Sequence, residues 1–135
     1  MNVLTFTSSE QDEKFYGIMG PFFADKTFFK IFGEPLYNEQ NSTWFIAFNA
    51  EEKVIGFCTA FKKKTHTFLN QFFVLDEYKS KGVGTVLFNK RLAYLKGCGE
   101  IRSMAKDERS VHLYRKNEFT AYGKRGNYNL FKKCI

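Results

Sequence analysis

Residues 72–87 of the chain have the sequence FFVLDEYKSKGVGTVL, and the rest of the chain is organised around this stretch. Its apolar start is typical of a β-strand, its polar middle is typical of a turn, and two glycines begin a predicted helix. The first turn of a helix has unpaired N–H groups and a partial positive charge, so it favours anions. Gly82 and Gly84 lack a Cβ and let a phosphate approach the backbone, while Lys79 and Lys81 add two cations. We therefore predict that this turn binds a pyrophosphate.

The two glycines do not match either of two common phosphate-binding motifs. A dinucleotide fingerprint would have a third glycine at position 87, where the chain has Leu87, and a P-loop would need Gly-Lys-Ser/Thr, which the chain lacks. The alternative interpretation is a strand-to-helix turn whose glycines serve only close packing. The local pattern leaves both interpretations open.

Two segments resemble the GCN5-related N-acetyltransferase (GNAT) superfamily. Residues 79–84, KSKGVG, resemble its acetyl-CoA loop, which is usually Arg/Gln-x-x-Gly-x-Gly/Ala after a strand ending in Val. Lys79 stands where Arg or Gln is usual, so the charge is kept but the planar fork is lost. Residues 110–119, SVHLYRKNEF, resemble the family's Ala-x-x-Leu-Tyr-x-x-x-Gly-Phe helix, with Glu118 in place of Gly and Asp107 where an Asn is frequent. The two matches follow the family's order and cover roughly the C-terminal half of the chain.

The resemblance implies a site for acetyl-CoA. The strand before the loop would pair its backbone with the pantetheine arm at Phe73 and Val74, and the loop and first helical turn would hold the diphosphate. The expected binding residues in that part are Lys79, Ser80, Lys81, Gly82, Val83, Gly84 and Thr85.

Tyr114 matches the family tyrosine that can protonate the departing thiolate. A tyrosine side chain is protonated at neutral pH and can therefore donate. We expect Tyr114 to be the catalytic acid, the alternative being a ring that only packs between helix and sheet.

The general base is not evident in the sequence. The family often has a carboxylate near position 70, but this chain has Asn70 and Gln71, which cannot take up a proton usefully. His66 lies on the same predicted strand and His112 on the Tyr114 helix, and a lone histidine is more often structural or at the surface than catalytic. Water relayed through Asn70 or Gln71 is an equal alternative, so no base is assigned. No His/Cys cluster suggests a metal, and none is expected.

The predicted elements alternate in an α/β (α+β) pattern. Ser8 and Gln11 suggest a capping box before a first helix, Gly20-Pro21 is expected to kink or interrupt it, and a phenylalanine-rich second helix follows over residues 22–32. In the resembled family, residues 20–23 would border the acceptor site, the alternative being that these aromatics belong to the core. Further helices are predicted over residues 83–96 and 110–117, and strands over residues 3–7, 43–48, 54–61, 65–75, 101–105, 119–123 and 127–133. This order agrees with a single GNAT-like domain over residues 1–135, with a mixed, mostly antiparallel sheet of about six to seven strands and about four helices.

Composition excludes several classes of protein. The 135 residues are 44% hydrophobic and 19% aromatic, which excludes disorder and suggests one domain with most of its 17 Phe in the core. No apolar run approaches the roughly 20 residues of a membrane helix, and no signal peptide is predicted. Three cysteines without metal-ligand spacing predict free thiols in a reducing compartment. We expect a cytoplasmic monomer or homodimer.

The formal charge is +7, from 21 Lys and Arg against 14 Asp and Glu, which favours an anionic partner. The phosphates of acetyl-CoA account for part of this charge, nucleic acid for more, and solubility alone is the alternative. The main hypothesis is an N-acyltransferase that moves an acetyl group from acetyl-CoA to a primary amine. One alternative is the same reaction on an amine linked to nucleic acid, motivated by the clusters Lys62-Lys63-Lys64 and Lys124-Arg125. Another is a non-catalytic module that binds CoA or a partner, motivated by Glu118 and the missing strand carboxylate.

Overall fold

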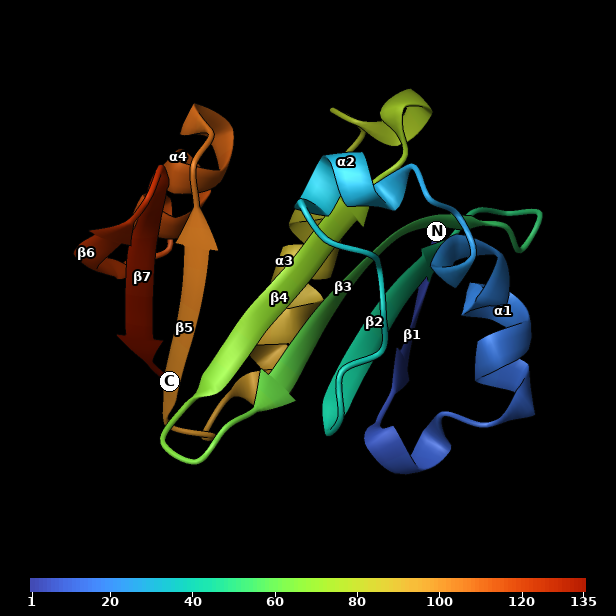
Figure 1. Cartoon of the computed structure of the whole chain (residues 1–135), viewed down its shortest axis with the longest axis horizontal. Helices are drawn as coiled ribbons and strands as arrows, with labels where there is room; N and C mark the ends of the chain where they lie inside the picture. The colour runs from blue at the N-terminus through green and yellow to red at the C-terminus, as the bar shows by residue number, and fades with distance from the viewer.

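A computed structural model describes residues 1–135 and arranges seven strands in one sheet, in the order β1-β2-β3-β4-β5-β7-β6 (Figure 1). All neighbouring strands are antiparallel except β4 and β5, which are parallel. The predicted fold class, a mixed and mostly antiparallel sheet with four α-helices, is confirmed. The strands are β1 (Asn2–Phe6), β2 (Ser42–Phe48), β3 (Val54–Lys62), β4 (Thr67–Val74), β5 (Glu100–Ala105), β6 (Thr120–Arg125) and β7 (Tyr128–Cys134). The helices are α1 (Glu13–Phe23), α2 (Phe28–Phe32), α3 (Val83–Leu95) and α4 (Glu108–Lys116).

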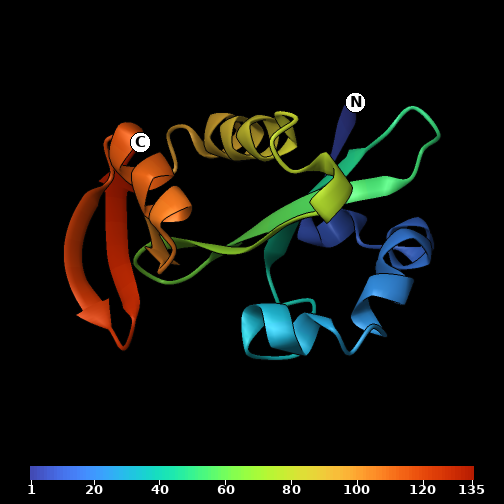
Figure 2. The same cartoon turned by 90° about the horizontal axis from the view of Figure 1, so that it is seen from above.

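The helices form one layer on each side of the sheet (Figure 2). Seen from above, α1 and α2 lie on one face, and α3 and α4 lie on the other. The core under α1 and α2 is aromatic: Trp44 lies 5.7 Å from Phe15 and 5.5 Å from Phe57, ring centre to ring centre. The core under α3 is mostly aliphatic around Leu87 and becomes aromatic towards α4. Phenylalanine is therefore core-forming on both faces, as its abundance predicts.

The parallel pair β4 and β5 is joined over a very short distance. β4 pairs with β3 along its length, but it pairs with β5 only at Thr67 and Phe68, after which the two strands diverge. The β3–β4 register shifts between Cys58 and Thr59, which leaves Gln71 without a cross-strand partner and with a φ of +28°. A bulge of this kind bends a strand. The sheet therefore has a wedge-shaped gap between β4 and β5, which opens towards the start of α3.

The first helix begins later than the sequence predicted. Residues 8–10 form a short 3₁₀ turn, and α1 begins at Glu13 after Asp12, whose carboxylate accepts hydrogen bonds from the N–H groups of Lys14 and Phe15. The prediction of a helix start at Ser8–Gln11 was wrong because Asp12 supplies the stronger N-cap.

The predicted interruption at Gly20-Pro21 was also wrong. Pro21 lies inside α1, which continues to Phe23, and the break comes at Asp25, whose carboxylate accepts from the backbone N–H and the hydroxyl of Thr27. The second helix is consequently short and ends at Gly33, with a φ of +75°. Near the C-terminus, α4 begins two residues earlier than predicted because Asp107 caps it.

Other expectations agree with the structure. The final hairpin of β6 and β7 is confirmed, and all three cysteines are free thiols. None of the helices combines the length and apolar character needed to cross a membrane.

Candidate functional site

The glycine turn has the geometry of an open anion site. Ser80 and Gly82 both adopt left-handed backbone conformations, with φ of +65° and +86°. Gly82 caps α3 without a side chain, and no atom lies within 4 Å of where its Cβ would be. The first hydrogen bond of the helix runs from the Val86 N–H to the Gly82 carbonyl, so the N–H groups of residues 83–85 have no helical partner. Unpaired donors at a helix N-terminus are groups to which phosphates bind in proteins.

The surroundings of Gly84 differ from those of Gly82. A Cβ on Gly84 would lie 3.6 Å from the Phe72 ring and 3.8 Å from a Val74 methyl, in ordinary contact with β4. A side chain would therefore fit at Gly84, and its two interpretations stay open. The glycine that close packing requires is Gly56 on β3, where a Cβ would lie 2.8 Å from the Phe73 carbonyl and 3.1 Å from Leu87 on α3.

The two lysines of the turn contact their neighbours. The Lys79 ammonium lies 2.8 Å from the Asp76 carboxylate, and the Lys81 ammonium lies 5.5 Å from the centre of the Tyr78 ring. Both members of the ion pair are exposed, so this pair is weak and can open for a competing anion. The cations are beside the turn as predicted, although neither is free.

The edge of β4 that faces the gap has no strand partner beyond Phe68. Phe73 directs its ring to the α2 face, where the ring centres of Phe28 and Phe57 lie 4.9 and 5.2 Å away. Its side chain is therefore a core element, and only the backbone of Phe73 and Val74 is available at the gap.

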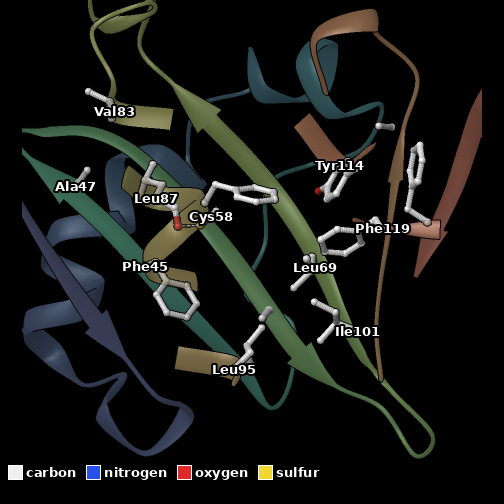
Figure 3. Close-up of a cluster of buried hydrophobic side chains, with 14 of the residues drawn as sticks. Phe45, Ala47, Cys58, Leu69, Val83, Leu87, Leu95, Ile101, Tyr114 and Phe119 are labelled. Carbon is white, nitrogen blue, oxygen red and sulfur yellow. Dashed lines mark hydrogen bonds between the residues drawn. The ribbon is translucent and has the colours of Figure 1, made fainter. Parts of the chain in front are cut away.

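Tyr114 lies on the other side of the gap, buried among aromatic rings. It is 7% exposed and packs against Phe88, Phe119 and Phe131 at centroid distances of 5.7, 5.0 and 5.4 Å. Its hydroxyl points towards β4 (Figure 3) and accepts a 2.6 Å hydrogen bond from the Ser103 hydroxyl. The Ser103 oxygen also lies 3.3 Å from the Leu69 carbonyl, so Ser103 places the Tyr114 hydroxyl in a short polar link between β5 and β4.

Arg91 on α3 is a buried charged group that the sequence analysis did not predict, and it lies next to the bulge of β4. It lies on the face of α3 that packs on the sheet and is 1% exposed. Its Nη1 donates to the carbonyls of Thr59 on β3 (3.0 Å) and Asn70 on β4 (3.2 Å), the cross-strand pair next to the bulge, while Nε and Nη2 have no partner. Its guanidinium carbon lies 5.3 Å from the centre of the Phe72 ring. No carboxylate pairs with this buried cation.

A cavity of about 490 Å³ lies on the face of the sheet opposite α3 and α4, beside the gap. Its walls come from the loop after α2, from the end of the β3–β4 hairpin, from β5 and from β6. The lining residues are Glu34, Tyr37, Glu39, Phe61, Lys63, Phe68, Asn70, Met104 and Arg125. A second hollow of about 500 Å³, between β1 and α1, is remote from the gap.

The cavity contains carboxylates, cations and aromatic rings. The Tyr37 hydroxyl donates to Glu39 (2.9 Å), which raises the pKa of Tyr37, and the Tyr37 carbonyl accepts from Gln71 (3.4 Å). The Lys63 ammonium lies 5.3 and 5.1 Å from the ring centres of Phe61 and Phe68. The bulge residue Gln71 therefore ties the gap to the cavity wall.

Several candidates from the sequence lie elsewhere. Residues 20–23 do not line the cavity: Phe22 packs on Phe57 and Phe23 on Trp44, so these rings are core. His66 lies in the turn before β4, where burial and nearby Arg102 and Lys63 lower its pKa. His112 is exposed on α4.

Cys58 also lies beneath α3 but cannot act as a nucleophile at neutral pH. Burial raises the pKa of its thiol to about 11, and the thiol contacts the Leu87 carbonyl. No group of three or more His, Cys, Asp or Glu side chains is placed to hold a metal ion.

Sequence reasoning missed three parts of the site. Arg91 could have been found, because a charged residue seven positions after Gly84 falls on the same helix face. Ser103 gave no signal beyond its position on a predicted strand. Glu34, Tyr37 and Glu39 lie in a loop that the sequence marks only as polar, and their convergence with Arg125 depends on the whole fold.

Comparisons with known proteins agree with this geometry. The model of the acetyltransferase (GNAT) family matches residues 6–119. Among curated proteins, a search found no significant match.

Solved structures share the fold at low sequence identity. A GNAT-family acetyltransferase from Staphylococcus aureus Mu50 has a TM-score of 0.67 at 13% identity, covering 98% of this chain and 99% of that one. An acyl-CoA N-acyltransferase from Pseudomonas aeruginosa has a TM-score of 0.73 at 10% identity, covering 98% of both chains. The PaiA N-acetyltransferase from Thermoplasma acidophilum, in complex with coenzyme A, has a TM-score of 0.63 at 17% identity over both full chains.

Proposed function

Because the chain belongs to the acetyltransferase (GNAT) family, we propose that it is an N-acyltransferase that transfers an acetyl group from acetyl-CoA to a primary amine. One observation carries the proposal: the β4–β5 gap has a helix N-terminus without a side-chain cap at its open end and a buried tyrosine hydroxyl deeper inside. The first feature suits the diphosphate of the donor, and the second suits its departing sulfur.

The donor would lie along the gap. The N–H groups of residues 83–85 and the cations of Lys79 and Lys81 would hold the diphosphate, and Ser80 and Gly82 shape the turn around it. The pantetheine arm would follow the unpaired edge of β4 at Phe73 and Val74. The bound coenzyme A in the Thermoplasma acidophilum enzyme supports this class of donor.

The transfer forms a C–N bond and breaks a C–S bond. The neutral amine attacks the thioester carbonyl, and the nitrogen of the tetrahedral adduct gives its extra proton to solvent. The adduct then expels the thiolate, which takes the proton of Tyr114. The ammonium form of the amine first loses one proton to solvent or to a cavity group. After release of the products, Tyr114 is reprotonated from solvent.

The acceptor would reach the thioester through the cavity on the other face of the sheet. Asn70 and Met104 place that cavity at the gap, and Glu34 and Glu39 give it two carboxylates that favour an ammonium group. The free thiols fit a reducing compartment, so we place the protein in the cytoplasm.

One reason for considering a non-catalytic module loses its force. Glu118, which replaces the usual glycine, adopts a φ of +66°. Its backbone N–H donates to the Arg115 carbonyl, and the N–H of Phe119 donates to the Tyr114 carbonyl. The end of α4 therefore keeps the geometry that a glycine would give, and Tyr114 keeps its place.

Two measurements test the proposal. Acetyl-CoA should raise the melting temperature, because a ligand that binds only the folded state stabilises it, whereas pantetheine without phosphates should do much less. A panel of primary amines should then release free thiol from acetyl-CoA in proportion to enzyme concentration. Equal stabilisation by both ligands would remove the diphosphate role of the turn, and binding without thiol release for any amine class would favour the non-catalytic module.

A further inference from the structure

The excess positive charge is concentrated in the C-terminal part of the chain. Residues 96–135 contain ten Lys and Arg against four Asp and Glu, whereas residues 1–95 contain eleven against ten. The diphosphate turn lies in the nearly neutral part. Binding of acetyl-CoA at that turn therefore does not account for most of the net charge.

Several of these cations share the face of the sheet that carries the cavity. Ser103 on β5 points to Tyr114 on the helix side, so its neighbours Arg102 and Met104 point to the opposite face, where Met104 lines the cavity. Arg102 is the cross-strand partner of Lys132 on β7. Both lie over the ring of Tyr122, with the guanidinium carbon 5.7 Å and the ammonium 5.3 Å from its centre.

The same face continues into the cavity at two places. Arg125, at the end of β6, and Lys63, after β3, both line it. We call Lys63, Arg102, Tyr122, Arg125 and Lys132 the basic face. A carboxylate next to it, Glu100, is paired with Arg102.

This face has no helix over β5, β6 and β7. Figure 2 shows α1 and α2 beneath the N-terminal strands, while α3 and α4 cover the opposite side. Every residue of β6 is exposed, and the Tyr122 ring is 42% exposed. The basic face is therefore accessible and ends at the mouth of the proposed acceptor cavity.

Cations grouped around a partly exposed aromatic ring match the chemistry of a single-stranded nucleic acid. The cations suit phosphates, and the part of the Tyr122 ring that Arg102 and Lys132 leave exposed can contact a base. The carboxylates of Glu34 and Glu39, across the cavity, repel phosphate but attract an ammonium group. We propose that the basic face binds single-stranded RNA and that the acceptor amine is carried on that RNA into the cavity. The RNA-binding part of this inference is independent of the proposed acyltransferase function, and the part that concerns the acceptor amine rests on it.

The binding half is tested without any acyl donor. Anisotropy of a labelled single-stranded RNA of about 12 nucleotides is measured against salt concentration for the full chain and for Arg102→Gln/Lys132→Gln. We expect the double variant to lose about tenfold in affinity and its salt slope to fall by about 1.4, at about 0.7 per phosphate contact. The control, Lys90→Gln/Lys96→Gln, changes the charge equally at two exposed positions on α3 and just after it, on the other side of the sheet, and should leave the slope unchanged.

A second variant tests the stacking. Tyr122→Ala should weaken RNA binding about tenfold without changing the salt slope, since it removes a ring and no charge. Equal losses of RNA affinity in the Arg102/Lys132 and Lys90/Lys96 double variants would overturn the RNA assignment. Equally tight binding of polyglutamate would also overturn it, in favour of an acidic protein partner. Melting temperatures of all variants establish that they are folded.

The acceptor half is tested by thiol release. An RNA esterified with an amino acid should react at least about tenfold more efficiently than the same amino acid as a simple ester, and the Arg102/Lys132 variant should lose that advantage. A simple ester that reacts equally well overturns the RNA-borne acceptor while leaving the acyltransferase proposal intact. RNA binding without thiol release from any amine supports the binding half and contradicts the enzyme.

Discussion

The two sides of the β4–β5 gap differ in how their side chains are held. On the α3 side, Tyr114 and Arg91 are 7% and 1% exposed, and each is fixed by hydrogen bonds and aromatic contacts. On the cavity side, Glu34, Lys63 and Arg125 are exposed. Buried, hydrogen-bonded groups have fixed geometry, whereas exposed charges contribute little to stability and can change at little structural cost. Under the proposed function, the α3 side would carry the chemical step, and the cavity side would select the acceptor.

If this comparison is right, substitutions on the two sides should alter different kinetic constants. Changes on the α3 side should lower kcat, because they act on the transition state. Changes on the cavity side should raise the KM for the amine and leave acetyl-CoA binding unchanged.

The largest expected effect is that of Tyr114→Phe. The change removes one hydroxyl and keeps the ring among its aromatic neighbours. If the hydroxyl protonates the thiolate, kcat should fall by roughly 10²–10⁴-fold with almost unchanged acetyl-CoA affinity. If Tyr114 only packs, turnover survives and stability changes by about 1 kcal/mol. Steady-state kinetics with a good acceptor and a thermal shift with acetyl-CoA separate these outcomes.

Arg91→Met is expected to have the next largest effect, which is a lower kcat/KM without a lower melting temperature. The carbonyls of Thr59 and Asn70 lose a donor, but an unpaired buried charge also disappears, so the melting temperature should not fall. Because the bulge at the gap is no longer held, kcat/KM should fall by about tenfold to a hundredfold.

The control for this prediction is Arg91→Lys, which keeps the charge and a donor and should recover part of kcat/KM. A strong loss of stability with unchanged kcat/KM would make Arg91 a purely structural residue.

On the cavity side, Glu39→Gln tests the other half of the comparison. The change removes one charge with little change in shape, so the KM for a cationic amine should rise by about tenfold, the usual worth of a charged hydrogen bond. Both kcat and the thermal shift with acetyl-CoA should stay near their original values. A fall in kcat with constant KM would instead place Glu39 in the proton transfer.

The smallest effect is expected from Glu118→Gly, which lies on neither side of the gap. A residue other than glycine is strained at a φ of +66° by about 1–2 kcal/mol, and glycine removes this strain. Part of the stabilisation is lost again because glycine makes the unfolded chain more flexible. Unfolding in denaturant should therefore show that the free energy of unfolding rises by about 0.5–1 kcal/mol, while kcat and KM stay unchanged. A loss of stability would mean that the Glu118 side chain contributes more than its backbone strain costs.

What the sequence predicts well is local. The turn from Val74 to Gly84 and the helix with Tyr114 depend on neighbours within a few residues, so their pattern is visible in the chain. The errors in the first helices are also local: Asp12 is a stronger cap than Ser8, and a proline is tolerated within α1. In each case two local signals competed, and the pattern of residues alone did not rank them.

What the sequence does not predict depends on contacts between distant segments. The cavity joins a loop near Tyr37 to the end of β6 at Arg125, and nothing in either segment points to the other. The bulge at Gln71 arises from pairing of β3 with β4, and Arg91 is explained only by the two carbonyls that this pairing leaves accessible.

The short ladder between β4 and β5 has a consequence for how the chain opens. Only two residue pairs join the sheet segments β1–β4 and β5–β7 by strand pairing, and the rest of the connection is the side-chain core beneath α3 and α4. The two segments are therefore candidate foldons. Any molecule that fills the gap touches both segments and couples their opening. Amide hydrogen exchange in β5 and β7 should therefore slow when such a molecule binds. For the same reason, resistance of β5–β7 to proteases should rise with the concentration of acetyl-CoA.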